Sequence, residues 1–174
     1  MSRQALQESL AAGGRHHALQ RLAGEWEGTA RVWFEPGKLG DEAPIRGSIR
    51  VVLGGRFVVH EYATTFMGTP NEGIAIIGWH IDAGRYEMAW VDAGHNGSAI
   101  MFSEGGHAAA GIAVLGSYFA TDGSAAWGWR TTIETPADDR LLITAWNVSP
   151  DGDEARATEI EYRRRGGSGN GSVG

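Results

Sequence analysis

The chain has 174 residues, of which 42% are apolar and 21% charged, a balance typical of a folded globular domain and not of a disordered chain. A net charge of −6 argues against a nucleic-acid-binding surface, and the absence of Cys excludes disulfides and thiolate chemistry. No stretch approaches the ~20 apolar residues of a transmembrane helix. We therefore expect one soluble, cytoplasmic domain with neither a nucleic acid nor a membrane as partner.

Residues 1–22 carry the only helical spacing worth naming, because Leu6 and Leu10 lie four residues apart on one helix face. This spacing predicts a short N-terminal helical segment that caps one end of the domain. Trp26, which follows it, is expected beneath that segment at the closed end.

From residue 25 onward the pattern changes to strict alternation. Between 26 and 34 every second residue is apolar or small and most residues between them are polar, which is typical of a strand with one buried face. The 27 Gly, more than twice the usual share of about 7%, fall mainly at turns between such segments. Further strands are predicted near 45–53, 57–67, 73–81, 85–92, 98–104, 108–115, 125–134, 140–148 and 155–164.

About ten strands joined by tight turns, with no long helix between them, predict an all-β fold, an antiparallel meander closed into a barrel over residues 23–165. Closure buries one face of each strand and removes exposed sheet edges. The Gly- and Ser-rich segment 166–174 has the composition of a flexible tail and is left out of the barrel.

Three segments resemble the domain-of-unknown-function 1579 family. They are LAGEWEG at 22–28, LGGRFVVHEY at 53–62 and GWHIDAGRYEMAWVD at 78–92, and the third is the most specific. The resemblance covers roughly residues 18–165 and implies a calycin-like (lipocalin-like) barrel. It implies no reaction.

The opening segment 24–28 is also similar to that of the nitrobindin barrels, which bind ferric haem through a His on a late strand. The predicted strands 140–148 and 155–164 contain no His. We therefore expect no haem ligand there and no cofactor.

The Trp residues and their neighbours predict an aromatic wall, because residues two apart on a strand project from the same face. Such a wall either lines a cavity for a small hydrophobic, planar molecule or fills a solid core. The expected wall residues are Tyr86, Met88, Trp90, Trp127, Trp129 and Trp146.

Two carboxylates are candidates for general acid/base catalysis or for anchoring a ligand. Asp92 continues the apolar phase of its strand, so its carboxylate is expected on the inner face; alternatively it ends the strand and accepts N–H bonds from the 94–97 turn. The more apolar of the two alternating sets between 57 and 64 contains Glu61. Glu61 is accordingly expected inside the barrel and His60 outside.

His95 and His107 sit at predicted turns and would form a two-His-one-carboxylate metal set if they met Asp92 or Glu104 at one barrel mouth. No short metal-ligand spacing supports such a set, and no metal is expected. Nucleophile, phosphate-loop and dinucleotide motifs are also absent from the predicted barrel.

The predicted function is binding of a small hydrophobic molecule in the aromatic cavity. The alternative is a barrel enzyme, an isomerase, cyclase or dehydratase, with a pocket carboxylate as general base. A third interpretation is an interaction module with a solid core. Apolar residues are also expected on outer strand faces, where a homodimer would cover them. These residues are Val58, Phe66, Ile74 and Ile76.

Overall fold

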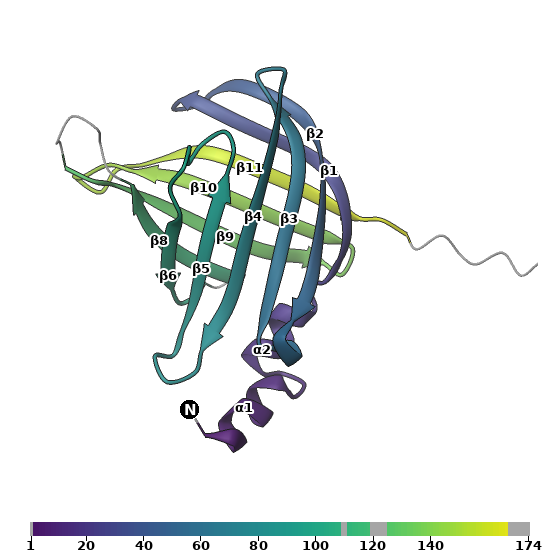
Figure 1. Ribbon diagram of the computed structural model, residues 1–174. Coiled ribbons are helices and arrows are strands. Elements are labelled where there is room, and N and C mark those ends of the chain that lie inside the picture. Colours follow the sequence, from purple (N-terminus) through teal and green to yellow (C-terminus); the bar gives the residue numbers. More distant parts are fainter. Residues whose placement is uncertain (1, 109–110, 119–124, 167–174) are drawn as a thin grey trace, which may run out of the picture.

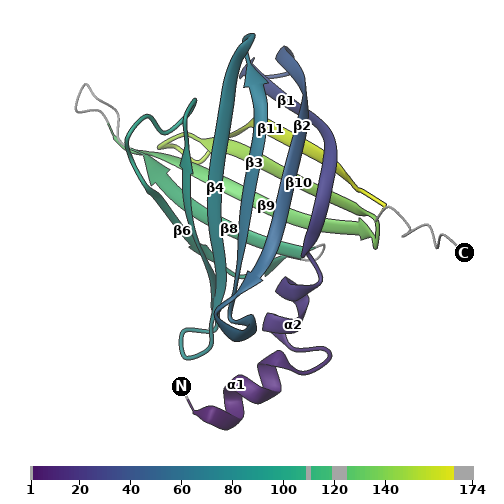
Figure 2. The ribbon, with the colours of Figure 1, turned by 45° about the vertical axis from the view of Figure 1, so that its right-hand side comes forward.

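A computed structural model of the chain describes residues 2–108, 111–118 and 125–166 (Figures 1 and 2). Two short α-helices and a 3₁₀ turn accompany the strands: α1 (Arg3–Leu10), α2 (Arg15–Gln20) and η1 (Leu53–Gly55). The strands are β1 (Gly24–Glu35), β2 (Lys38–Val52), β3 (Phe57–Phe66), β4 (Thr69–His80), β5 (Arg85–Asp92), β6 (Met101–Gly105), β7 (His107–Ala108), β8 (Gly111–Tyr118), β9 (Trp127–Ala137), β10 (Arg140–Val148) and β11 (Glu154–Arg164).

The strands form one closed antiparallel barrel. Consecutive strands pair from β1 to β6 and from β8 to β11, and β11 pairs back with β1. Closure comes from β6 and β8, where Ser103 lies opposite Gly116 and Glu104 opposite Leu115. The predicted all-β meander barrel with a helical segment at one end is confirmed.

The largest difference between predicted and observed strand boundaries is at β2, which begins at Lys38 and not near residue 45. A tight turn with Gly37 at a φ of 76° reverses the chain directly after β1, so the two strands form one long hairpin. Residues 38–42 are polar or exposed, and their pattern lacks the apolar alternation that marks a buried strand. The expected tail lies, from residue 167 onward, outside the described residues.

The helical segment closes the lower end of the barrel in Figure 1. Leu19 is fully buried there, and Trp26 at 1% exposure donates its indole N–H to the carbonyl of Leu22 over 3.0 Å. The guanidinium of Arg164 lies 4.2 Å from the centre of the Trp26 ring. The predicted position of Trp26 beneath the helices is therefore confirmed.

Gly28 allows β1 to approach β11 closely beside Trp26. A Cβ at this position would lie 1.8 Å from the carbonyl oxygen of Glu161 on β11, so only glycine permits this approach of the two strands.

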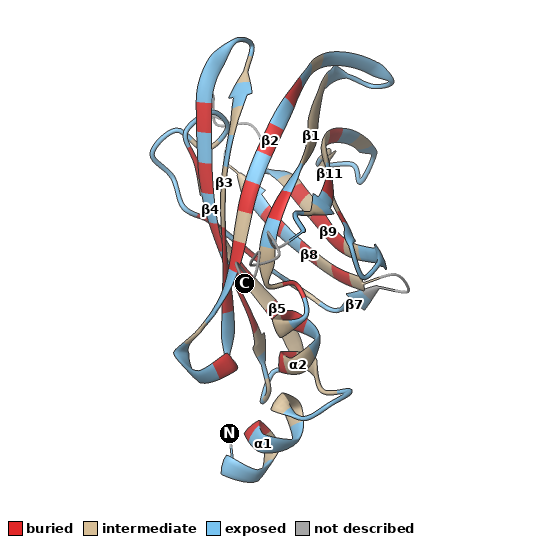
Figure 3. Cartoon of the chain, turned by 90° about the vertical axis from the view of Figure 1, so that its right-hand side faces the viewer, coloured by how far each residue is buried: buried red, intermediate tan, exposed pale blue. Residues whose placement is uncertain are grey.

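Buried and exposed residues alternate along β2 and β4 (Figure 3), as expected for strands with one inner and one outer face. Ile74 and Ile76 are on the outer face as predicted, at 43% and 47% exposure. The expectation for Val58 and Phe66 is wrong, because the inner face of β3 is the opposite one: Val58 is fully buried and Phe66 lines the interior. Among the described residues, no helix combines the length and apolarity needed to cross a membrane.

Candidate functional site

A pocket opens at the barrel end opposite the helices. It contains about 850 Å³ of unfilled space when its open mouth is included, and the centre of a water molecule can occupy about 90 Å³ of this. A single buried water requires about 10–15 Å³ on the latter measure. The interior is thus hollow at this end and has room for a small molecule of about one ring. Its apolar wall includes Ile45, Ala75, Ile77, Met88, Trp90, Trp129, Ile133 and Ala145.

Asp92 lies at the polar edge of this pocket, at the last position of β5. Its side chain is 1% exposed. The chain turns back immediately after it, so that the backbone N–H groups of Gly94 and His95 donate to Oδ1 over 2.6 and 2.5 Å. Both sequence expectations for Asp92 hold together, because it faces the interior and also accepts hydrogen bonds from the following turn.

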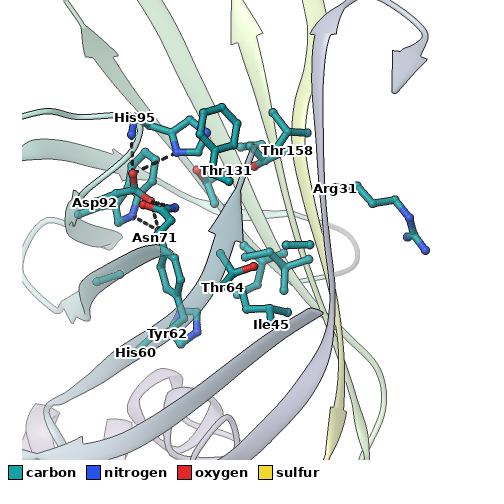
Figure 4. A pocket seen from close by; sticks show the side chains of 18 of the residues that line it. Arg31, Ile45, His60, Tyr62, Thr64, Asn71, Asp92, His95, Thr131 and Thr158 are labelled. Atoms are coloured by element: carbon teal, nitrogen blue, oxygen red, sulfur yellow. Dashed lines mark hydrogen bonds and ion pairs between the residues drawn. The ribbon is translucent and has the colours of Figure 1, made fainter. Parts of the chain in front are cut away.

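The second oxygen of Asp92 is bound by side chains of neighbouring strands. The hydroxyl of Tyr62 donates to Oδ2 over 2.5 Å, and the amide of Asn71 donates to the same oxygen over 3.2 Å. The indole of Trp90 in turn donates to the Tyr62 hydroxyl over 3.1 Å. Figure 4 shows Tyr62, Asn71 and His95 converging on Asp92.

Tyr62 reaches Asp92 across an intervening strand because the residue between them is Gly73, which has no side chain. Tyr62 pairs with Gly73, and Gly73 pairs with Asp92, so the three residues form one row across β3, β4 and β5. A Cβ at Gly73 would lie 2.3 Å from the Tyr62 hydroxyl oxygen. The missing side chain therefore provides the space through which the hydrogen bond forms.

The electrostatics of this network determine the protonation of its members. Burial opposes ionisation of Asp92, but hydrogen bonds from His95 and Tyr62 outweigh it and hold the pKa of the carboxyl well below its usual range. Burial, together with the negative charge of Asp92, raises the pKa of the Tyr62 hydroxyl far above its usual range. Asp92 is thus an ionised acceptor and Tyr62 a neutral donor.

His60 lies deeper in the pocket, where the sequence predicts Glu61. It is 4% exposed, its Nε2 is 3.1 Å from the Tyr162 hydroxyl, and burial lowers its pKa to about 4. Glu61 faces outward and pairs with Arg50 over 3.2 Å. The predicted inward orientation of Glu61 is therefore wrong, because the Tyr162 hydroxyl provides His60 with a buried partner and Arg50 offers Glu61 an exposed one.

Three of the six predicted wall residues line the pocket: Met88, Trp90 and Trp129. The two indoles are stacked at 5.6 Å between ring centres. Tyr86 shares their phase but lies at the closed end, where it packs against Trp79.

Trp127 and Trp146 do not line the pocket. Trp127, at the first position of β9, is 38% exposed. A bulge between Ala145 and Trp146 interrupts the pairing of β10 with β11, and the Trp146 ring lies under the guanidinium of Arg130, 3.8 Å away. Ile143 and Ala145 line the pocket, so alternation along β10 already directs Trp146 outward.

The two turn histidines lie at opposite ends of β5 and β6. Trp90 pairs with Met101 and Tyr86 with Gly105, so His95 follows β5 at the open end while His107 follows β6 at the other. The hypothesis that they meet at one mouth is therefore wrong. No cluster of three or more His, Asp or Glu suited to a metal occurs in the described part of the chain.

His95 instead belongs to the aromatic group at the pocket mouth. Its ring centre is 5.3 Å from that of Phe66, 6.0 Å from that of Trp90 and 6.3 Å from that of Trp129, and its Nδ1 is 3.1 Å from Oδ1 of Asp92. Sequence patterns do not single out Tyr62 or Asn71, because their positions in the network depend on cross-strand register, for which a single sequence contains no signal.

Comparisons with known proteins identify a family and two structures that the chain resembles. A family model described as "Protein of unknown function (DUF1579)" matches residues 11–164. The crystal structure of Rv2717c from M. tuberculosis is similar with a TM-score of 0.60 and 14% identity, over 91% of this chain and 98% of that one. A de novo designed fluorescence-activating β-barrel shows a TM-score of 0.42 and 17% identity, over 85% of this chain and 97% of the designed one. No curated protein matches the sequence.

Proposed function

The chain belongs to the family described as "Protein of unknown function (DUF1579)", whose description names no activity, and we propose that this member binds a small hydrophobic molecule at the open end of its barrel. The observation that carries the proposal is a hollow, mainly apolar pocket with a few polar side chains, among them Asp92, His95 and Thr131. Ligand sites in proteins combine these two features.

The pocket dimensions favour a flat ligand with about one ring. The part of the pocket in which the centre of a water molecule fits, about 90 Å³, is confined between apolar side chains and the stacked indoles of Trp90 and Trp129. Aromatic faces pack well against planar molecules. A longer ligand would extend through the mouth beside His95.

The polar group of the ligand would contact His95 or Thr131 and not Asp92. Both oxygens of the Asp92 carboxylate already accept hydrogen bonds from the described donors around them, so they are occupied within the protein. Thr131, in contrast, lines the pocket and has a buried hydroxyl without a hydrogen-bond partner among the described residues. A buried hydroxyl without a partner is costly, and a ligand that bonds to it removes that cost.

The proposal is tested by filling the pocket. Ala75 lines it at 5% exposure, so Ala75→Leu places extra carbons in the space that the ligand would occupy. Ala89→Leu is the matched control, because Ala89 lies on the outer face between Ile76 and Phe102.

We expect single-ring aromatic compounds to quench the tryptophan fluorescence of the wild type and of Ala89→Leu at micromolar to millimolar concentrations. Ala75→Leu should bind at least about tenfold more weakly, which corresponds to about 1.4 kcal/mol. Native mass spectrometry of the purified protein would show whether a molecule is retained. Equal affinity in the two variants, or no quenching by any compound, would contradict the proposal.

A further inference from the structure

The orientation of His95 leaves one ring nitrogen available to a ligand. Asp92 is ionised and has no proton to donate, so Nδ1 of His95 must be the donor in their 3.1 Å contact. In the neutral form of the ring, the lone pair is then on Nε2. Nε2 has no hydrogen-bond partner among the residues that the structure describes, and His95 lines the pocket.

The loop that carries His95 is held in place by several hydrogen bonds. The N–H of His95 donates to Asp92, the N–H of Ala93 donates to the carbonyl of Glu72 over 2.9 Å, and the Asn96 amide donates to the carbonyl of Trp90 over 3.3 Å. Aromatic rings then surround the imidazole. A reactive group held in one geometry needs little rearrangement when the substrate binds.

Building on the proposed binding function, we propose that the pocket catalyses proton abstraction from carbon, with His95 Nε2 as the general base and Asp92 as a positioning residue. The substrate class is a small, planar, mainly apolar carbon acid. In the step, a C–H bond breaks, the proton passes to Nε2, and the electron pair moves onto a conjugated electron-withdrawing group of the substrate. Return of the proton from Nε2 to another atom would complete an isomerisation without a co-reactant.

Thr131 provides a donor for the charge that develops in this step. Its hydroxyl is buried and lacks a partner in the described chain, and it lines the same end of the pocket as His95 (Figure 4). A donor directed at developing negative charge stabilises a transition state more than a ground state. This arrangement differs from the sequence interpretation, in which the carboxylate itself was the base.

The test uses 5-nitrobenzisoxazole, a flat carbon acid of two fused rings that reports on bases without a co-reactant; its second ring would extend through the mouth beside His95. A base removes the proton on its ring carbon, the electron pair forms a nitrile, the N–O bond breaks, and a coloured phenolate is released. We expect the wild type to convert this probe faster than an equal concentration of imidazole in solution.

His95→Ala should lower kcat by about 100-fold, within the range of general-base contributions, with little change in KM. Added imidazole should restore part of the lost rate by occupying the vacated space. The matched control is His80→Ala, because His80 is also bonded through Nδ1 to a carboxylate, Glu87 at 2.9 Å, but lies exposed on the outer face. That variant should retain the wild-type rate.

Asp92→Asn tests the positioning role. The amide can donate as well as accept, so it no longer selects the ring form with a free Nε2. The rate constant kcat should fall about tenfold or more while KM stays near that of the wild type. A structural role alone would instead alter both parameters or the unfolding transition.

The outcomes separate the two proposals. If the probe quenches tryptophan fluorescence but His95→Ala converts it as fast as the wild type, or imidazole restores nothing, the base assignment is overturned and the binding function stands. Binding with no conversion above free imidazole overturns it as well. If neither the probe nor any single-ring compound binds, both proposals fail.

Discussion

The two ends of the barrel are both built from aromatic side chains, but one is filled and the other is hollow. At the closed end Trp26, beneath the helices, is 1% exposed and donates to a main-chain carbonyl. At the open end Trp90 and Trp129 stack on each other and border unfilled space. The same residue type thus completes the core at one end and lines a pocket at the other.

The polar groups differ in the same way. The indole N–H of Trp26 bonds to the backbone within its own segment, whereas that of Trp90 bonds to Tyr62 in a network that reaches Asp92 and His95. A network that joins several strands requires cross-strand register and space between side chains. Such requirements are typical of sites and unnecessary for a filled core.

The largest expected effect comes from breaking the closed end. Trp26→Ala should lower the free energy of unfolding by about 3–5 kcal/mol, because it removes a fully buried indole and leaves a cavity. Urea unfolding followed by circular dichroism measures this. Trp127→Ala, at a 38% exposed position, should cost about 1 kcal/mol or less. A similar cost for both variants would contradict the assignment of Trp26 to the core.

The next effect concerns pH and His60, which lies between the two ends. Burial lowers its pKa to about 4 from 6.5, so the unfolded chain binds this proton more tightly than the folded one. Stability should therefore be fully present above about pH 6.5 and fall as the pH decreases towards 4, by on the order of 3 kcal/mol.

Comparison with His60→Gln isolates this contribution, since burial also lowers the pKa of His16 and acts in the same direction. The variant should lose stability less steeply between pH 6.5 and 4 in urea titrations at each pH. An unchanged slope would show that His60 is not the residue responsible.

A smaller effect is expected at the open end from Gly73→Ala. The added Cβ would lie 2.3 Å from the Tyr62 hydroxyl oxygen, so the Tyr62–Asp92 bond must lengthen or break. We expect a loss of about 1–3 kcal/mol in unfolding free energy and weaker binding of pocket ligands. Gly106→Ala, where a Cβ meets nothing within 4 Å, is the control. Wild-type ligand affinity in Gly73→Ala would show that the network does not shape the pocket.

The smallest effect is expected on the outer face. Ile76→Thr replaces a 47% exposed apolar residue with another β-branched one and should change the free energy of unfolding by less than about 0.5 kcal/mol. The measurement should be repeated over a range of protein concentrations. A larger, concentration-dependent loss would indicate that a second copy of the chain covers this face.

Periodicity in the sequence was sufficient for the barrel, because burial of one face imposes alternation on every strand. The helical segment over 1–22 and the burial of Trp26 also followed from local pattern. The same reasoning placed Asp92 inside, since it continues the phase of Met88 and Trp90.

Alternation alone could not place Glu61. The two alternating sets of β3 differ little in apolarity, and the choice between them depends on Tyr162, which is 102 residues from His60 in the chain. Trp146 is out of phase with Ile143 and Ala145, which line the pocket, so its outward position follows from the alternation along β10.

Only the tertiary structure assembled the polar edge of the pocket. Tyr62, Asn71 and His95 come from three different segments and meet at Asp92 because strand register and the missing side chain of Gly73 bring them together. The sequence by itself determined which faces are apolar and hence that a barrel forms. Which polar side chains share its interior depends on contacts between distant strands, because register is a property of paired strands and not of any one of them.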